Sequence, residues 1–152
     1  MRPAAGGSTL AMNHPANGTA IASRRLHAEN PTMIRPDALA DIYRDLHANP
    51  GLLFAETRTA GIVADFLNEL GFEVTTGVGG TGVIGILRNG DGATALLRAD
   101  MDALPVREET GLPYASTVTT TDAAGSEVPV MHACGHDIHV TCLLGACAEL
   151  AA

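Results

Sequence analysis

The chain has 152 residues, of which 46% are hydrophobic and 3% aromatic, and its formal net charge at pH 7 is −8. This length and composition allow one globular domain whose core is packed mainly from aliphatic side chains. The negative charge argues against binding to nucleic acid, whose phosphates require a basic face. No apolar run approaches the ~20 residues needed to cross a bilayer, so we expect no contact with a membrane. Three cysteines without a CxxC pair favour a reducing, cytoplasmic setting.

The first 34 residues differ in composition from the rest of the chain. They are rich in Ala, Gly, Asn, Ser and Pro and show neither a helical nor an alternating period. We interpret residues 1–34 as a disordered leader or an over-extended start, with Met33 as an alternative first residue. Residues 35–152 then form the structured part.

From residue 35 onward the pattern predicts an α/β fold. Apolar residues at helical spacing predict a helix that starts at Pro36 and stops before Asn49-Pro50-Gly51. A second apolar stripe from Ile62 to Leu70 predicts another helix, with Gly71 as the left-handed residue beyond its end. Residues 72–76 alternate between apolar and polar, as a strand does.

The next elements are predicted from a turn sequence and a third apolar stripe. Two apolar runs, residues 83–87 and 95–99, flank Asn89-Gly90-Asp91-Gly92, which predicts a hairpin of paired and largely buried strands. Residues 106–130 are polar and rich in turn formers, which is typical of a long connection that carries a site. A last helix is predicted after Asp137, a good N-cap, and both Cys142 and Cys147 are expected in its packed core.

A glycine pattern at residues 80–85 matches the GxGxxG sequence of dinucleotide-binding loops. That mechanism requires the glycines to open a helix, whose N-terminal amides bind the pyrophosphate. Here they open a predicted strand, so we interpret them as residues of a tight loop.

Five side chains that can bind metals lie within eight residues near the end of the chain. They are His132, Cys134, His136, Asp137 and His139. A Cys-x-His pair on a glycine-containing turn can direct a thiolate and an imidazole at one cation, a combination suited to zinc and neighbouring transition metals. We therefore favour Cys134 and His136 as metal ligands, although two ligands do not complete a site.

Two other interpretations of the Cys-x-His pair stay open. Cys134 could be a nucleophile with His136 as its base, although in such enzymes the histidine usually comes from a distant segment. The pair could also be structural, as a buried cysteine next to a hydrogen-bonded histidine.

Asp100 and Asp102 follow the second apolar run of the predicted hairpin. Residues i and i+2 of an extended chain face the same side, so both carboxylates could lie near the cation or orient a ligand histidine. Capping of the turn at the end of a strand explains them equally well. His132 and His139 are weaker candidates, because ordinary polar roles account for them without a metal.

Two motifs in order support a resemblance to a known family. Residues 97–106 read Leu-Arg-Ala-Asp-Met-Asp-Ala-Leu-Pro-Val, and residues 131–137 read Met-His-Ala-Cys-Gly-His-Asp. This pair, joined by residues 108–114, resembles metal-dependent amidohydrolases of the hippurate hydrolase and auxin-conjugate hydrolase group. That group belongs with the aminoacylase and carboxypeptidase metallopeptidases. The similarity covers about residues 35–152, including Asp45-Leu46-His47 and residues 56–61.

The resemblance implies a fold and a reaction. The fold is the N-terminal portion of a metallopeptidase-type catalytic domain, α/β with a mixed β-sheet flanked by helices, into which the family inserts a lid or dimerisation domain further on. The reaction is hydrolysis of an N-acyl amino acid, the small-molecule substrate, with a divalent ion (Mn, Zn, Co or Ni) that polarises the amide and acidifies the water.

The resemblance also assigns roles to residues. Cys134 and His136 match two metal ligands of the family, Asp102 is the candidate catalytic residue, and Asp100, Asp137 and His139 are candidates for supporting or joining the ligands. The family's proton-transferring glutamate lies in an acidic pair downstream of the Cys-x-His motif, whereas Glu108-Glu109 lies upstream and does not match it.

We therefore expect residues 35–152 to be the N-terminal part of the catalytic domain, with the lid domain and the remaining ligands absent. By itself this chain is expected to be an inactive fragment of an enzyme whose full-length form could be a homo-oligomer. The alternative is a truncated or degenerate product with no enzymatic role of its own.

Overall fold

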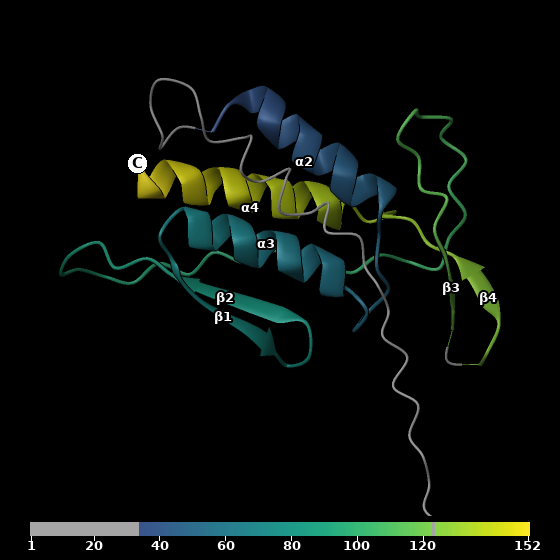
Figure 1. Cartoon of the computed structure of the whole chain (residues 1–152), viewed down its shortest axis with the longest axis horizontal. Coiled ribbons are helices and arrows are strands. Elements are labelled where there is room, and N and C mark those ends of the chain that lie inside the picture. Colours follow the sequence, from purple (N-terminus) through teal and green to yellow (C-terminus); the bar gives the residue numbers. More distant parts are fainter. Residues whose placement is uncertain (1–33, 123) are drawn as a thin grey trace, which may run out of the picture.

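A computed structural model describes residues 34–122 and 124–152 of the chain (Figure 1). The predicted leader therefore lies outside the described residues, apart from Ile34. The elements, labelled as in Figure 1, are α2 (Pro36–Ala48), α3 (Thr57–Glu69), β1 (Glu73–Val78), β2 (Gly82–Ile86), β3 (Thr119–Thr121), β4 (Glu127–Pro129) and α4 (His136–Ala151).

The three helices lie side by side, with α4 between α2 and α3 (Figure 1). The β1–β2 hairpin packs against α3, and the β3–β4 hairpin lies apart from it, beside the loops that precede α4. Each of the two sheets has two antiparallel strands. The α/β class is confirmed, and its helices form a layer in which α4 contacts both neighbours.

The core lies between the helices. Ile42 and Leu46 of α2, Phe66 of α3 and Leu144 of α4 are each no more than 2% exposed. Burying such a side chain stabilises the fold by about 1.5–3 kcal/mol relative to leaving it in water. At Gly145 an added Cβ would lie 3.1 Å from Leu39 Cδ1, so the small residue allows α4 to approach α2 closely.

The first two helices confirm the sequence prediction. Pro36 occupies the first turn of α2, where its missing N–H is not needed, and Asn49 is the C-cap. Gly71 adopts φ +83° beyond the end of α3, a left-handed conformation that costs glycine little. This residue turns the chain from α3 into β1.

The predicted pairing of residues 83–87 with residues 95–99 is wrong. Strand β2 pairs instead with β1, in a register that places Glu73 opposite Ile86 and Thr76 opposite Val83. The turn of this hairpin contains Gly79 and Gly80, both with positive φ. Strand β2 starts at Gly82, so the GxGxxG pattern of residues 80–85 leads into a strand, as predicted.

Residues 95–99 form no strand, and neither apolar run is buried as expected. Leu96 is 90% exposed and Ile84 is 47% exposed. An Asn-Gly turn signal is local, and it does not reveal that an earlier strand competes for the same partner.

The start of α4 also differs from the prediction. Its N-cap is Gly135 with φ +76°, and Asp137 lies inside the first turn, where it is only 2% exposed. Of the two cysteines expected in the core, Cys147 is buried, but Cys142 is exposed.

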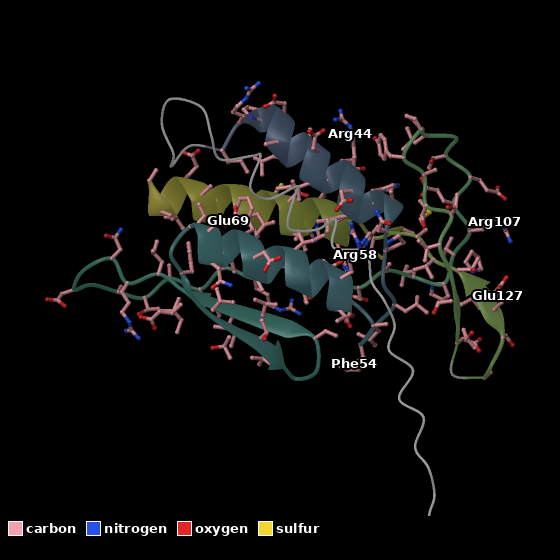
Figure 2. All side chains as sticks on the ribbon, viewed as in Figure 1. Arg44, Phe54, Arg58, Glu69, Arg107 and Glu127 are labelled. Atoms are coloured by element: carbon pink, nitrogen blue, oxygen red, sulfur yellow. The ribbon has the colours of Figure 1, made fainter. Side chains whose placement is uncertain are left out.

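Charged side chains such as Arg107 and Glu127 project outward from the loops and strands around β4 (Figure 2). No helix in the described ranges is long and apolar enough to cross a membrane.

Candidate metal centre

Two isolated bridges bring the segments of the candidate site together. Ala103 pairs with Leu52 in parallel, and Leu104 pairs with Met131 in antiparallel fashion. The Leu104–Met131 bridge has both backbone hydrogen bonds, with N–O distances of 2.9 and 3.0 Å. Asp102 is thereby held beside the start of α4, although 34 residues separate it from His136.

His136 faces Asp102 through one ring nitrogen. Its Nδ1 lies 2.9 Å from the backbone oxygen of Asp102 and 3.0 Å from the carboxylate Oδ1 of the same residue. Because both neighbours are acceptors, these contacts favour the tautomer with its proton on Nδ1. Nε2 then keeps its lone pair, which is the arrangement of a metal-binding histidine oriented by a carboxylate.

Cys134 lies in the turn that precedes α4 and is exposed. Gly135 separates it from His136, and its backbone adopts a left-handed conformation that residues other than glycine rarely adopt. The turn therefore presents a thiol next to an imidazole whose Nε2 is available, and this donor set suits a transition metal ion.

The remaining candidates have different surroundings. Asp100 forms an ion pair with Arg98 and not with His136. His139 is exposed and lies against the ring of His136, with 5.7 Å between the ring centroids. Of the two predicted carboxylates, the structure thus places only Asp102 in contact with His136.

His132 is a buried histidine without a hydrogen-bond partner. It is 5% exposed, and neither Nδ1 nor Nε2 has a partner among the described residues. Burial lowers its pKa, although the carboxylates of Asp137 and Asp102 act in the opposite direction. A buried polar group left unpaired costs about 1–3 kcal/mol, so this imidazole fits a site that binds a further group.

The described residues do not complete a metal centre. Within residues 34–122 and 124–152, no three side chains of His, Cys, Asp or Glu form a group that could hold a metal ion. Cys134 and His136 therefore fit as two donors of a site that needs more. A cavity of about 180 Å³ in the described part, lined by residues such as Pro50 and Glu56, contains none of the candidates.

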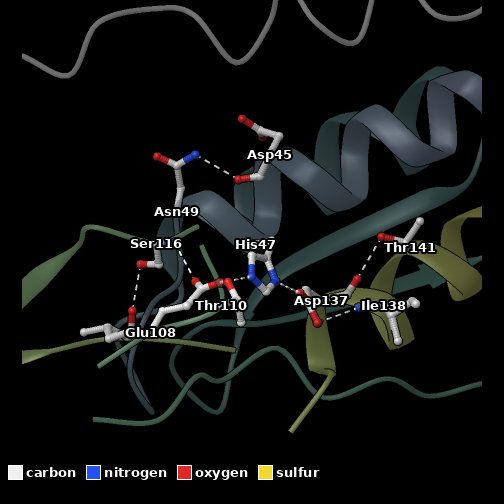
Figure 3. Close-up of polar contacts among 10 residues, drawn as sticks. Asp45, His47, Asn49, Glu108, Thr110, Ser116, Asp137, Ile138 and Thr141 are labelled. Atoms are coloured by element: carbon white, nitrogen blue, oxygen red, sulfur yellow. Dashed lines mark hydrogen bonds and ion pairs between the residues drawn. The ribbon is translucent and has the colours of Figure 1, made fainter. Parts of the chain in front are cut away.

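A buried hydrogen-bonded network (Figure 3) includes Asp137, the residue directly after His136. His47 of α2 places Nδ1 2.6 Å from Asp137 Oδ2 and Nε2 3.0 Å from Glu108 Oε1. The His47 side chain is 7% exposed, that of Asp137 2% and that of Glu108 0%. We call these three residues the His47 clamp.

The pKa values of the clamp are shifted in opposite directions. Burial alone would lower the pKa of His47, but hydrogen bonds to Glu108 and Asp137 outweigh it and raise that pKa. Burial would raise the pKa of Glu108, but hydrogen bonds from Thr110, His47 and the Ser116 amide lower it. In the clamp, each ring nitrogen of the imidazole thus faces a carboxyl oxygen, an arrangement that favours the protonated form of His47.

Sequence reasoning did not single out the clamp. His47 and Glu108 entered it only as parts of motifs, and 61 and 90 residues separate His47 from its two partners. Asp137 was expected as an N-cap or metal support, but its carboxylate accepts from His47 and from the Ile138 amide. A histidine on the buried face of a predicted helix was the available signal.

Comparisons with known proteins identify similar sequences and structures. Residues 96–152 match the model of Peptidase family M20/M25/M40. The hippurate hydrolase of Campylobacter jejuni is 48% identical over 111 residues, which are 72% of this chain and 27% of that protein. A Rhodococcus jostii protein named as a glutamate–cysteine ligase is 47% identical over 112 residues, which are 74% of this chain and 13% of that protein.

The fold matches a solved structure as well. The crystal structure of Bacillus subtilis YXEP, described as a dinuclear metal binding peptidase from the M20 family, superposes with a TM-score of 0.64 at 34% identity. The match covers 87% of this chain and 31% of that one. The fold and these matches relate the chain to metallopeptidase-type hydrolases. Its residues 96–152 are similar to Peptidase family M20/M25/M40, and the chain spans about a quarter of the length of the hippurate hydrolase.

Proposed function

We propose that this chain supplies part of the active site of a hydrolase that cleaves N-acyl amino acids into a carboxylic acid and an amino acid. Similarity to Peptidase family M20/M25/M40 supports hydrolysis, and the relation to a hippurate hydrolase supports this substrate class. The observation that carries the proposal is His136, whose Nδ1 faces Asp102 while Nε2 keeps a lone pair, in the same turn that carries Cys134 two residues earlier.

The residues have distinct roles in this proposal. Cys134 and His136 donate to a divalent ion (Mn, Zn, Co or Ni), and Asp102 orients the His136 ring. When bound, this ion would polarise the amide carbonyl and lower the pKa of the attacking water. His139 lies against His136 and Asp100 pairs with Arg98, whereas the Asp137 carboxylate is engaged by His47. Further donors and the proton-transferring carboxylate come from outside residues 34–152.

The replacement of Cys134 by serine tests this proposal. In the complete gene product we expect Cys134→Ser to lose bound metal and hippurate hydrolysis together, because a hydroxyl replaces a thiolate poorly. Metal content is measured by elemental analysis after gel filtration. Cys142→Ser is the matched control, since Cys142 is also exposed but lies outside the turn, and it should keep its metal. Unchanged metal in Cys134→Ser contradicts the assignment of this ligand.

The wild-type gene product also distinguishes the proposed enzyme from a cysteine-dependent hydrolase and from a non-catalytic product. A cysteine-dependent hydrolase would survive chelation by EDTA and be inactivated by iodoacetamide, whereas the proposed enzyme loses activity on chelation. An intact mass near 15.6 kDa for the native product, without bound metal, would instead indicate a non-catalytic product. A larger mass with bound metal supports the proposal.

A further inference from the structure

We infer that His47 is a positioning residue, which fixes the segment carrying Asp102 relative to the turn carrying Cys134 and His136. The inference rests on the proposed function, because those residues matter as donors and as orienting groups only if a metal is bound. His47 itself belongs to α2 and contacts none of the three.

The clamp joins the two segments through their nearest buried carboxylates. Glu108 follows Asp102 by six residues, beyond the Leu104–Met131 bridge, and Asp137 follows His136 directly. His47 binds one carboxylate with each ring nitrogen, at 3.0 and 2.6 Å. The imidazole is rigid, so it sets the distance between the two carboxylates, as a flexible chain could not.

Each carboxylate is in turn held by its own segment. The Oε2 of Glu108 accepts from the Ser116 amide at 2.6 Å, and its Oε1 accepts from the Thr110 hydroxyl at 2.5 Å. The Oδ1 of Asp137 accepts from the Ile138 amide at 2.9 Å. A displacement of His47 is therefore passed to the backbone of both segments.

The His47 ring is also held from its sides. Its centroid lies 5.6 Å from that of Tyr43 and 5.5 Å from that of Tyr114, and the ring planes are tilted by 47° and 81°. Tyr43 belongs to α2 and Tyr114 to the loop after Glu108, so the ring is packed against both elements.

The contact between His136 and Asp102 depends on this placement. A hydrogen bond weakens steeply once its atoms move a few tenths of an ångström beyond about 3.2 Å. The two contacts of His136 Nδ1 lie at 2.9 and 3.0 Å, and a shift of α4 relative to residue 102 would lengthen both. Loss of such orienting contacts weakens metal binding about 10- to 100-fold in other proteins.

Three variants of the complete gene product test the inference. In His47→Asn the amide can replace Nδ1 and bind Asp137 alone, and in His47→Gln it can replace Nε2 and bind Glu108 alone. His47→Leu binds neither carboxylate. We expect all three to bind Co²⁺ at least about tenfold more weakly than the wild type, and to lose intensity in the thiolate-to-cobalt absorption band.

The matched control is Glu56→Gln. Glu56 is 4% exposed and accepts from the Phe54 amide and the Thr81 hydroxyl. It is therefore a buried polar link whose two side-chain hydrogen bonds both go to residues outside the two segments of the site. We expect Glu56→Gln to lower the melting temperature while the Co²⁺ affinity and spectrum stay within about twofold of the wild type. Equal effects of Glu56→Gln and His47→Leu on Co²⁺ binding would overturn the positioning role, as would wild-type binding by His47→Leu.

Hydrogen exchange distinguishes failure of the positioning role from failure of the proposed function. Absence of Co²⁺ binding by the wild type would refute the metal-dependent function. The positioning role would then be decided by amide exchange in residues 101–106 and 131–138. Faster exchange in both segments of His47→Leu, and not of Glu56→Gln, supports the role, and unchanged exchange overturns it.

Discussion

Two buried histidines near the Cys-x-His turn lie in contrasting surroundings. His47 binds a carboxylate with each nitrogen, and its pKa is raised, whereas both nitrogens of His132 lack a partner among the described residues and burial lowers its pKa. The buried ring of His47 is therefore stabilised by its neighbours. The burial of His132 costs free energy that no hydrogen bond from the described residues offsets. The two histidines should respond differently to substitution.

For His47 we predict a pH-dependent contribution to stability. Its pKa is higher in the folded state than the ordinary 6.5, so its contribution is complete below pH 6.5 and is lost as the pH rises through the raised value. Glu108 has a lowered pKa, so its contribution is complete above pH 4.5 and is lost as the pH falls through the lowered value. The clamp stabilises the fold most between about pH 4.5 and 6.5.

Urea unfolding of the metal-free wild type and of His47→Leu at pH 5.5 and 8.5 measures this contribution. The free energy lost on substitution should be larger at pH 5.5. The groups that face His47 are Asp137, Glu108, Tyr43, Tyr114 and His132. The pKa of Glu108 is lowered and burial raises the pKa of Tyr43, so neither of these two groups changes charge in that interval. An equal loss at both pH values would contradict a charged His47.

For His132 we predict that replacement by leucine does not destabilise the metal-free fold. Removing two unpaired buried nitrogens should raise the free energy of unfolding, by up to about 1–3 kcal/mol if the leucine packs well. Urea unfolding without metal measures the change. If His132→Leu is instead destabilised by several kcal/mol, the ring has a structural partner in solution.

Local patterns predicted the helices well, because the apolar periodicity of α2, α3 and α4 lies within one continuous segment in each case. Strand pairing was predicted less well, because the Asn89-Gly90 turn signal suggests pairing only between the segments on either side of it. Strand β2 pairs instead with the earlier strand β1. The clamp was not predicted at all, because it joins α2 to residues 61 and 90 positions away. The contact between Asp102 and His136 also required the bridge between Leu104 and Met131, which no local pattern reveals.

At the level of elements, two glycines predict opposite effects of the same substitution. Gly135 caps α4 with φ +76°, and although an added Cβ has space, alanine in this conformation costs about 1–2 kcal/mol. Gly61 lies inside α3 with nothing within 4 Å of an added Cβ, so alanine there should stabilise the fold by about 0.5–1 kcal/mol.

Urea unfolding of both variants measures this difference. Gly135→Ala should be less stable than the wild type, and Gly61→Ala should be more stable. Because Gly135 separates Cys134 from His136, Gly135→Ala should also weaken Co²⁺ binding. The same sign of stability change in both variants would contradict the left-handed cap.

For the whole molecule we predict self-association of the 152-residue chain through exposed apolar side chains. Leu96 is 90% exposed and Leu97 50%, and Ile84 and Ile86 of β2 are each nearly half exposed. Large exposed apolar surface promotes association. Sedimentation velocity should show that Leu96→Asp reduces association more than Leu53→Asp, a control at a residue that is 64% exposed outside this set. Equal effects would indicate association through another surface.

The distance in sequence between His47 and Asp137 has a consequence for synthesis on the ribosome. Ninety residues separate them, and translation at about 5–20 residues per second takes on the order of 5 to 20 s to cover that interval. A helix such as α2 can form in about a microsecond, long before its partner has left the exit tunnel. During this delay the nascent α2 exposes Ile42 and Leu46, so chaperones that bind apolar segments have several seconds to reach it before α4 is available for packing.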